Sequence, residues 1–206
     1  MADSKQAPLD AAAAAKAAFA SIQDKPFPSD IFTAPQLRWA VIGCGVIANQ
    51  MAQSLALAGR KLAGVANRTL SKAQVFAKQY GVEKVYDRVE DLYADPDIDA
   101  VYITTPHNTH ITYLRAALAA GKHVLCEKAI TLNTAELDEA RAIANEHNVV
   151  LMDATTVFHM PLYQELRRRM DAGEFGRMNL AQLNFGSYKE YGDLTNRFYN
   201  RNLAGG

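Results

Sequence analysis

The segment that decides the fold reads Trp39-Ala-Val-Ile-Gly-Cys-Gly-Val-Ile-Ala48, in which an apolar run ends in two glycines and a helical pattern begins at once. This is the G-x-G-x-x-G/A fingerprint of a dinucleotide-binding βα turn. Gly43 permits the tight turn, Gly45 lets the backbone approach a pyrophosphate, and Ala48 lets helix and strand pack closely. The amides that open the helix then face the phosphates. The expected cofactor contacts along this turn are Gly43, Cys44, Gly45, Val46, Ile47 and Ala48.

From Leu37 onward, short apolar runs alternate with helical patterns. We expect strands over 38–42, 61–67, 85–86, 100–104, 123–126 and 149–152, and helices over 46–58, 71–80, around 92–93, from 108 to about 120, and from 133 to 147. This order predicts an α/β Rossmann fold over residues 37–155, with a doubly wound, mostly parallel sheet. Ligands of such sheets bind beyond the carboxyl ends of the strands, where the strand order reverses.

Asn67 and Arg68 follow the second predicted strand. An enzyme strict for NAD usually places Asp or Glu here, to bond the ribose 2′-hydroxyl. A carboxylate would repel a 2′-phosphate, whereas an arginine attracts one. The pair therefore favours NADP, or tolerance of both NADP and NAD. The alternative interpretation is that Arg68 is a solvated loop cation.

Glu127 and Lys128 follow the fifth predicted strand. A lysine beside a nicotinamide ring could bind a substrate hydroxyl and help manage its proton during hydride transfer. It could also only orient the substrate, or belong to an ordinary surface pair.

The loop after the fourth strand carries Thr105, Pro106 and His107, near the expected nicotinamide and its ribose. These three residues are further candidate cofactor contacts. His110 could contact the cofactor or the substrate as well, or it could bond only to backbone.

Composition excludes some classes of partner. Lys and Arg together number 22, as do Asp and Glu, so nothing in the charge favours nucleic acid or an anionic membrane. No apolar run approaches a membrane span, and we expect no metal site. Cys44 and Cys126 lie in apolar runs and are interpreted as buried thiols of a reducing compartment, the cytoplasm.

Two flanking regions differ from the central pattern. Residues 1–36 predict an Ala-rich helix and a Pro-rich linker, with a mobile tail as the alternative. Residues 156–206 predict the incomplete start of a second, antiparallel-sheet domain, with a helix over 161–172 and a strand over 179–185. An unpaired edge on that strand would favour self-association into a homo-oligomer, a dimer or higher.

The chain resembles the glucose–fructose oxidoreductase / inositol dehydrogenase (Gfo/Idh/MocA) family, closest to its dihydrodiol dehydrogenase-like branch. The matching segments are Gly43–Ala48, Thr105-Pro106 with His110, Ala120–Lys128 and Asp171–Gly176. The resemblance implies hydride transfer between NAD(P) and a sugar, polyol or cyclic diol, with Lys128 as the active-site lysine and Glu127 helping to hold the nicotinamide.

Two departures from that family have consequences. Ala129 replaces the usual proline, so the backbone that aims Lys128 is less constrained. The family also continues, beyond the Ala-Gly-Gly at 204–206, into a segment whose histidine is the usual acid–base partner of the lysine. We therefore expect these 206 residues to retain cofactor binding with weak or absent turnover, and robust turnover would refute this expectation.

Two other functions remain open. One is a non-catalytic dinucleotide-binding sensor or scaffold module. The other is a methyltransferase, because Ile-Gly-Cys-Gly also resembles a loop that holds S-adenosylmethionine. Such enzymes generally need an acidic residue after the second strand, which Asn67-Arg68 does not supply. Calorimetric titrations with NADPH, NADH and S-adenosylmethionine would separate these functions.

Overall fold

The computed structural model describes residues 34–184 and residue 186. They belong to two compact units, Pro35–Ala154 and a segment that begins at Thr155, and each unit is described by itself. The expected N-terminal helix and most of the linker over 1–36 lie outside the described residues.

The first unit is built on a parallel sheet. Its strands are β1 (Trp39–Ile42), β2 (Gly64–Ala66), β3 (Lys84–Tyr86), β4 (Ala100–Ile103), β5 (His123–Cys126) and β6 (Leu151–Asp153). Their order is β3-β2-β1-β4-β5-β6, and every neighbouring pair is parallel. The predicted doubly wound sheet is confirmed, with the reversal of order between β1 and β4. β2 is shorter than the expected 61–67, because its regular pairing with β1 begins only at Gly64.

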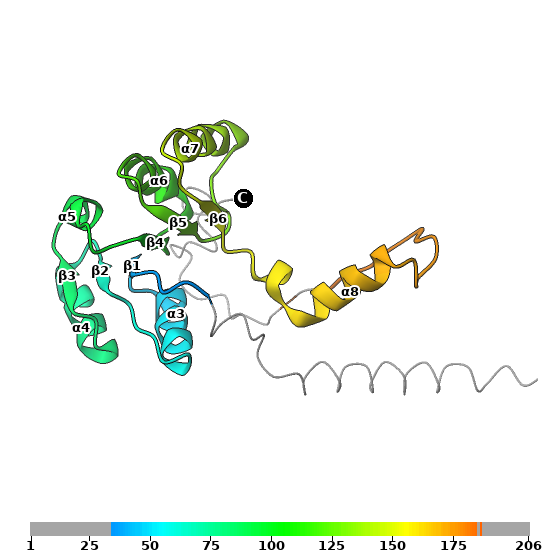
Figure 1. Ribbon diagram of the computed structural model, residues 1–206, viewed down its shortest axis with the longest axis horizontal. Coiled ribbons are helices and arrows are strands. Elements are labelled where there is room, and N and C mark those ends of the chain that lie inside the picture. The colour runs from blue at the N-terminus through cyan, green and yellow to red at the C-terminus, as the bar shows by residue number, and fades with distance from the viewer. Residues whose placement is uncertain (1–33, 185, 187–206) are drawn as a thin grey trace, which may run out of the picture. The chain divides into compact units, whose positions relative to one another are not determined.

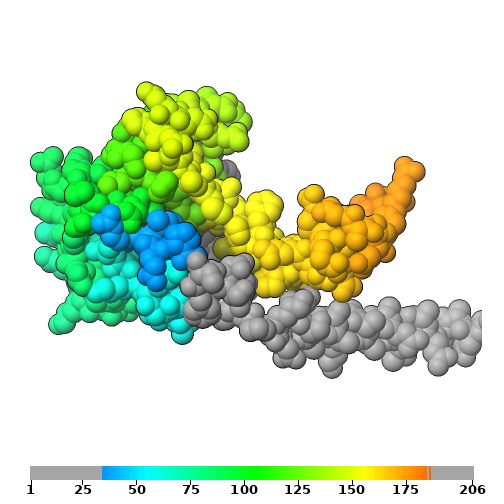
Figure 2. Space-filling view, viewed as in Figure 1, coloured from blue at the N-terminus to red at the C-terminus, as the bar shows by residue number. Residues whose placement is uncertain are grey.

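Helices cover both faces of this sheet (Figure 1). One face carries α3 (Val46–Leu57) and α4 (Leu70–Tyr80), and the other carries α5 (Val89–Ala94), α6 (His110–Ala119) and α7 (Thr134–Glu146). Alternate strand residues point to opposite faces, so the unit has two apolar cores. Val41 packs in the core with α3 and α4, and Ile42 packs in the core with α5, α6 and α7. In Figure 2 the blue surface of the residues that flank β1 adjoins cyan and green surfaces.

The predicted capping pair of α7 is formed. The Asn133 side chain accepts a hydrogen bond from the Glu136 amide at 2.9 Å, and the Glu136 carboxylate accepts one from the Leu132 amide at 3.1 Å. These bonds occupy backbone donors at the start of the helix, where no intrahelical acceptor exists.

The amino end of the sheet is held by a polar network. The buried Lys122 donates through Nζ to the backbone oxygens of Asp95 and Ile98, at 2.7 and 2.8 Å. Arg38 binds the Asp99 carboxylate at 2.6 Å. Lys122 belongs to the family-like segment Ala120–Lys128, and its role there is structural, because it holds the loop before β4 in place.

This network predicts acid sensitivity. Lys84 and Tyr86 bind the Asp95 carboxylate and hold its pKa well below the usual range, and Arg38 lowers the pKa of Asp99 to about 2. Groups with lowered pKa stabilise the fold above the unfolded-state value of about 4, and that stabilisation is lost as the pH falls through the folded-state value. We expect the free energy of unfolding to fall between about pH 4 and pH 2 in urea titrations followed by circular dichroism. Asp99→Asn should make this fall shallower, and an unchanged slope in that variant would contradict the assignment.

The second unit contains a short turn, η2 (Thr156–His159), and α8 (Pro161–Asp171). The predicted helix over 161–172 is confirmed, but the predicted strand is wrong: residues 179–184 form none, and Phe185 lies outside the described residues. An alternating pattern predicts a strand only where a partner strand completes its hydrogen bonds. The argument for self-association through that edge therefore loses its basis.

Candidate dinucleotide-binding site

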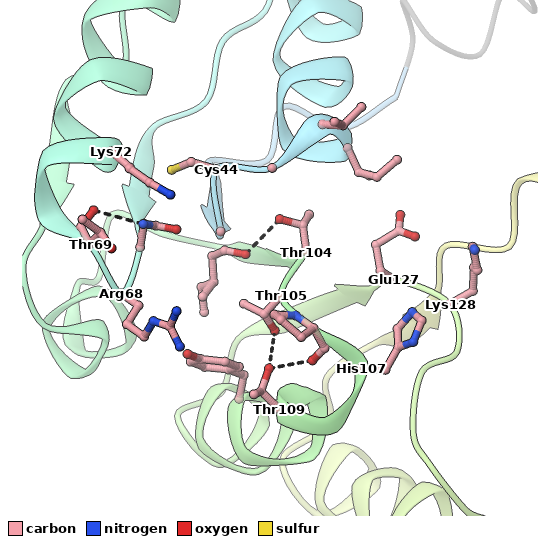
Figure 3. Close-up of a pocket in the computed structure, with 18 residues that line it drawn as sticks. Cys44, Arg68, Thr69, Lys72, Thr104, Thr105, His107, Thr109, Glu127 and Lys128 are labelled. Carbon is pink, nitrogen blue, oxygen red and sulfur yellow. Dashed lines mark hydrogen bonds between the residues drawn. The ribbon is translucent and has the colours of Figure 1, made fainter. Parts of the chain in front are cut away.

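A cavity of about 790 Å³ lies over the carboxyl ends of β1, β2, β4 and β5, within the range of about 300–1,000 Å³ typical of ligand pockets. It brings together loops that are far apart in sequence (Figure 3). Its lining residues are Ile42, Gly43, Cys44, Gly45, Val46, Ile47, Asn67, Arg68, Thr69, Lys72, Thr104, Thr105, Pro106, His107, Thr109, Tyr113, Glu127 and Lys128.

The two glycines of the first turn meet different demands. Gly43 has φ +103°, and a Cβ there would lie 2.7 Å from Thr104 Oγ1. It must be glycine because the end of β4 crowds it. At Gly45 a Cβ would meet nothing within 4 Å, so this residue borders open space at the amino end of α3. Ala48 is fully buried and does not line the cavity, so its predicted packing role is kept and its expected role as a direct cofactor contact is corrected.

The loop after β2 brings two cations to the cavity. Arg68 lines it as predicted, and the Asn67 side chain donates to the Thr69 backbone oxygen at 3.0 Å, which shapes the loop. Lys72, in the first turn of α4, lines the same side and was missed by sequence reasoning. Figure 3 shows Arg68, Thr69 and Lys72 together on one side. A lysine in the first turn of the helix that follows a strand-end loop is the signal that could have found it.

The loop after β4 forms another wall. Thr104 Oγ1 donates to the Ile42 backbone oxygen at 3.0 Å, which joins this loop to β1. Thr109 Oγ1 lies 2.8 Å from Thr105 Oγ1 and 2.7 Å from the Pro106 oxygen, within the short turn η1 (His107–Thr109). The cavity therefore includes the three predicted residues Thr105, Pro106 and His107.

Glu127 and Lys128 line the cavity on the side away from Arg68 (Figure 3). The Glu127 amide donates to the Ile103 oxygen at 3.0 Å, continuing the pairing of β4 with β5. The Tyr102 hydroxyl donates to the Glu127 carboxylate at 2.5 Å. Burial raises the pKa of Tyr102 and this bond raises it further, so the phenol stays protonated as a donor. Sequence reasoning missed Tyr102, a polar group in an otherwise aliphatic strand.

His110 does not reach the cavity. It is fully buried, and its ring nitrogens lie 2.9 Å from the backbone oxygens of Thr105 and Ala129. The interpretation of His110 as a direct cofactor or substrate contact is therefore corrected, because its ring bonds to backbone behind the wall.

The cysteines offer little reactivity. Both cysteines are free thiols; Cys126 is buried as expected, whereas Cys44 is only half-buried and lines the cavity. Burial raises the pKa of Cys44 to about 11, against a smaller lowering by Lys72, and burial also raises the pKa of Cys126. Within residues 34–184 and 186, no group of three or more His, Cys, Asp or Glu side chains could hold a metal ion. No helix in that part of the chain has the length and apolarity to cross a membrane.

Comparison with known proteins decides the family. The family model described as an oxidoreductase family with an NAD-binding Rossmann fold, Gfo/Idh/MocA, matches residues 37–155, which is more than half of the chain. The chain belongs to this family. Its matched region begins just before β1 and ends just after β6, so the family's fold coincides with the first unit.

Within the family, similar curated proteins are trans-1,2-dihydrobenzene-1,2-diol dehydrogenases. Those of Mus musculus and Homo sapiens are 36% and 35% identical over 153 residues, which is 73% of this chain and 46% of each relative. The chain thus spans slightly less than half the length of these relatives.

The chain is also similar to solved structures of a ketoreductase and an oxidoreductase. The 3-ketoreductase KijD10 from Actinomadura kijaniata, in complex with NADP and TDP-benzene, is 31% identical with a TM-score of 0.61, over 68% of this chain and 43% of that one. An NAD binding oxidoreductase from Klebsiella pneumoniae is 29% identical with a TM-score of 0.63, over 68% and 40% of the two chains.

Proposed function

We propose that this chain is the NADP-binding part of an oxidoreductase that transfers a hydride between nicotinamide and an alcohol or carbonyl carbon of a sugar, polyol or cyclic diol, with slow transfer by these 206 residues alone. One observation carries the proposal. A single cavity is lined by two cations, Arg68 and Lys72, on one side, by the Glu127-Lys128 pair on the other side, and by the glycine turn that leads into α3. The names of the dehydrogenase and ketoreductase relatives support this class of reaction.

The residues present fit the cofactor. The open space at Gly45, over the first amides of α3, suits a diphosphate, because those amides have no intrahelical acceptor. Arg68 and Lys72 would bind the 2′-phosphate of NADP, and the loop of Thr105, Pro106 and His107 would hold the nicotinamide ribose. When bound, the nicotinamide supplies or accepts the hydride.

Lys128 would handle the proton that accompanies the hydride. Facing a carbonyl, its ammonium would donate a hydrogen bond to the reacting oxygen, and facing an alcohol, its neutral amine would accept one from the hydroxyl. In alcohol oxidation the amine would take the hydroxyl proton as the hydride passes from carbon to nicotinamide, and in carbonyl reduction the ammonium would give a proton to the oxygen as the hydride passes to carbon. Tyr102 fixes the Glu127 carboxylate at the cavity wall, where it would help to hold the nicotinamide end.

Arg68→Ser and Lys72→Ala test the choice of cofactor. Each variant should raise the dissociation constant of NADPH by roughly 5- to 50-fold, because a hydrogen bond to a charged group contributes about 1.5–3 kcal/mol, discounted here for exposure to solvent. Affinity for NADH should change little, since NADH lacks the 2′-phosphate. Fluorescence titration with both nucleotides measures the ratio.

Lys78→Ala is the matched control for Lys72, because Lys78 is an exposed lysine of the same helix that does not line the cavity. It should leave both affinities unchanged. Equal losses of affinity for NADPH and NADH in the Arg68 and Lys72 variants would show that these cations do not bind the 2′-phosphate. NADPH binding without any turnover would favour a sensor or scaffold module.

We propose a cytoplasmic location, supported by two protonated, unpaired thiols, and a homo-oligomeric state, supported by the resemblance to the family. Light scattering that gives the mass of a single chain would contradict the second proposal.

A further inference from the structure

His110 stands out as a fully buried polar side chain at the first position of α6. Nε2 lies 2.9 Å from the Thr105 oxygen, and Nδ1 lies 2.9 Å from the Ala129 oxygen. Its ring also meets the His107 ring edge-on, with centroids 5.5 Å apart. Burying an imidazole is unfavourable unless its polar atoms have partners, so these backbone contacts account for its presence.

The two carbonyl groups belong to the two loops that flank one end of the cavity. Thr105 lines the cavity itself, and Ala129 directly follows Lys128, which also lines it. Backbone pairing between β4 and β5 continues as far as the Glu127 amide, which donates to Ile103. His110 therefore lies where the loops leave the sheet and would otherwise separate. Alanine at 129 does not restrict the backbone as a proline ring would, so an external tether matters more there.

We propose that His110 is a positioning residue for the nicotinamide end of the site. Its ring holds the loop that carries Glu127 and Lys128 against the loop that carries Thr105 and His107. A neutral imidazole donates one N–H and an imidazolium donates two, so the ring can serve one or both carbonyl groups. This inference rests on the proposed function, because it assigns His110 to one end of the same cofactor cavity.

Three variants separate the two contacts. His110→Asn keeps an amide nitrogen near the place of Nδ1, toward Ala129, and His110→Gln keeps one near the place of Nε2, toward Thr105. His110→Leu removes both. The probes are NADPH and 2′,5′-ADP, which shares the adenosine end of NADPH and lacks the nicotinamide.

The leucine variant should raise the NADPH dissociation constant roughly tenfold, as the loss of one or two ordinary hydrogen bonds implies, and change that of 2′,5′-ADP less than about twofold. The asparagine variant should lose the least affinity for NADPH, since it retains a hydrogen bond to the Ala129 oxygen, next to Lys128. The fluorescence of bound NADPH should change in parallel, because it reports the surroundings of the nicotinamide. A role in overall stability alone would weaken both probes alike.

His123→Leu is the matched control. His123 also bonds to backbone, accepting from the Val150 amide at 3.0 Å, but it lies at the opposite end of β5. It should leave the ratio of the two affinities unchanged. The inference is overturned if the three His110 variants weaken both probes equally, if NADPH binding is unaltered in all three, or if asparagine is no better than leucine. If the leucine variant does not fold, the asparagine and glutamine variants decide. An unchanged chain that binds neither probe would instead overturn the proposed function.

Discussion

Lys128→Met is expected to slow hydride transfer by about 100- to 10,000-fold, the usual contribution of a positioned acid or base, with the NADPH dissociation constant within about twofold of the original. Methionine keeps the length and apolar character of the side chain but can neither donate to the reacting oxygen nor exchange a proton with it. Because Lys128 is assigned to the substrate oxygen and not to the cofactor, this variant should lose hydride transfer and keep its affinity for NADPH.

The measurement is a single-turnover reaction, with the protein in excess over NADP⁺ and with trans-1,2-cyclohexanediol, myo-inositol or D-glucose as the alcohol, followed by NADPH absorbance. Excess protein makes slow transfer measurable. Lys61→Met is the control, since Lys61 is an exposed residue paired with Glu83, and such pairs contribute little. A rate that survives in Lys128→Met would remove the lysine from the chemistry. No transfer by the unchanged protein, with NADPH bound, would leave a binding module.

Gly45→Asp should abolish NADPH binding while the protein stays fully folded. Gly45 is the N-cap residue just before α3, with φ −77° and ψ −174°, which any residue can adopt, and a Cβ there meets no atom within 4 Å. Aspartate is among the preferred residues at this helix position, so the free energy of unfolding should hold or rise slightly. Its carboxylate would face the diphosphate, and repulsion of a few kcal/mol raises the dissociation constant by at least about 100-fold.

Gly45→Asn is the neutral control for this charge. Asparagine has nearly the same shape and the same capping ability as aspartate but no charge, so it should weaken NADPH binding less than aspartate does. Gly43→Ala, in contrast, should destabilise the fold. Its positive φ and the approach to Thr104 make any side chain strained, and we expect a loss of about 1–3 kcal/mol in the free energy of unfolding. Urea titrations and fluorescence titrations on the three variants give both quantities. Full NADPH affinity in Gly45→Asp would place the diphosphate elsewhere.

The fold was predictable because its signals are local. Each buried strand is a short apolar run, each helix repeats its apolar residues along one face, and glycines punctuate the turns. The same pattern locates Gly45, Arg68 and Lys128 immediately after strands. Parallel strands end at one edge of a sheet, so these residues were expected to share a cavity before any contact was known. The strand expected at 179–185 shows the limit, because alternation cannot say whether a partner strand is present.

Tertiary structure decided what the polar side chains do. Lys122 and Lys128 belong to one motif, yet one is buried against the carbonyl groups of a loop and the other lines the cavity. His110 was an open question in the sequence, and its ring proves to bridge two loops behind the site. The reason is physical: a buried polar group is defined by its hydrogen-bond partners. Those partners come from residues distant in sequence, whereas the apolar pattern that predicts a helix or strand lies within that element itself.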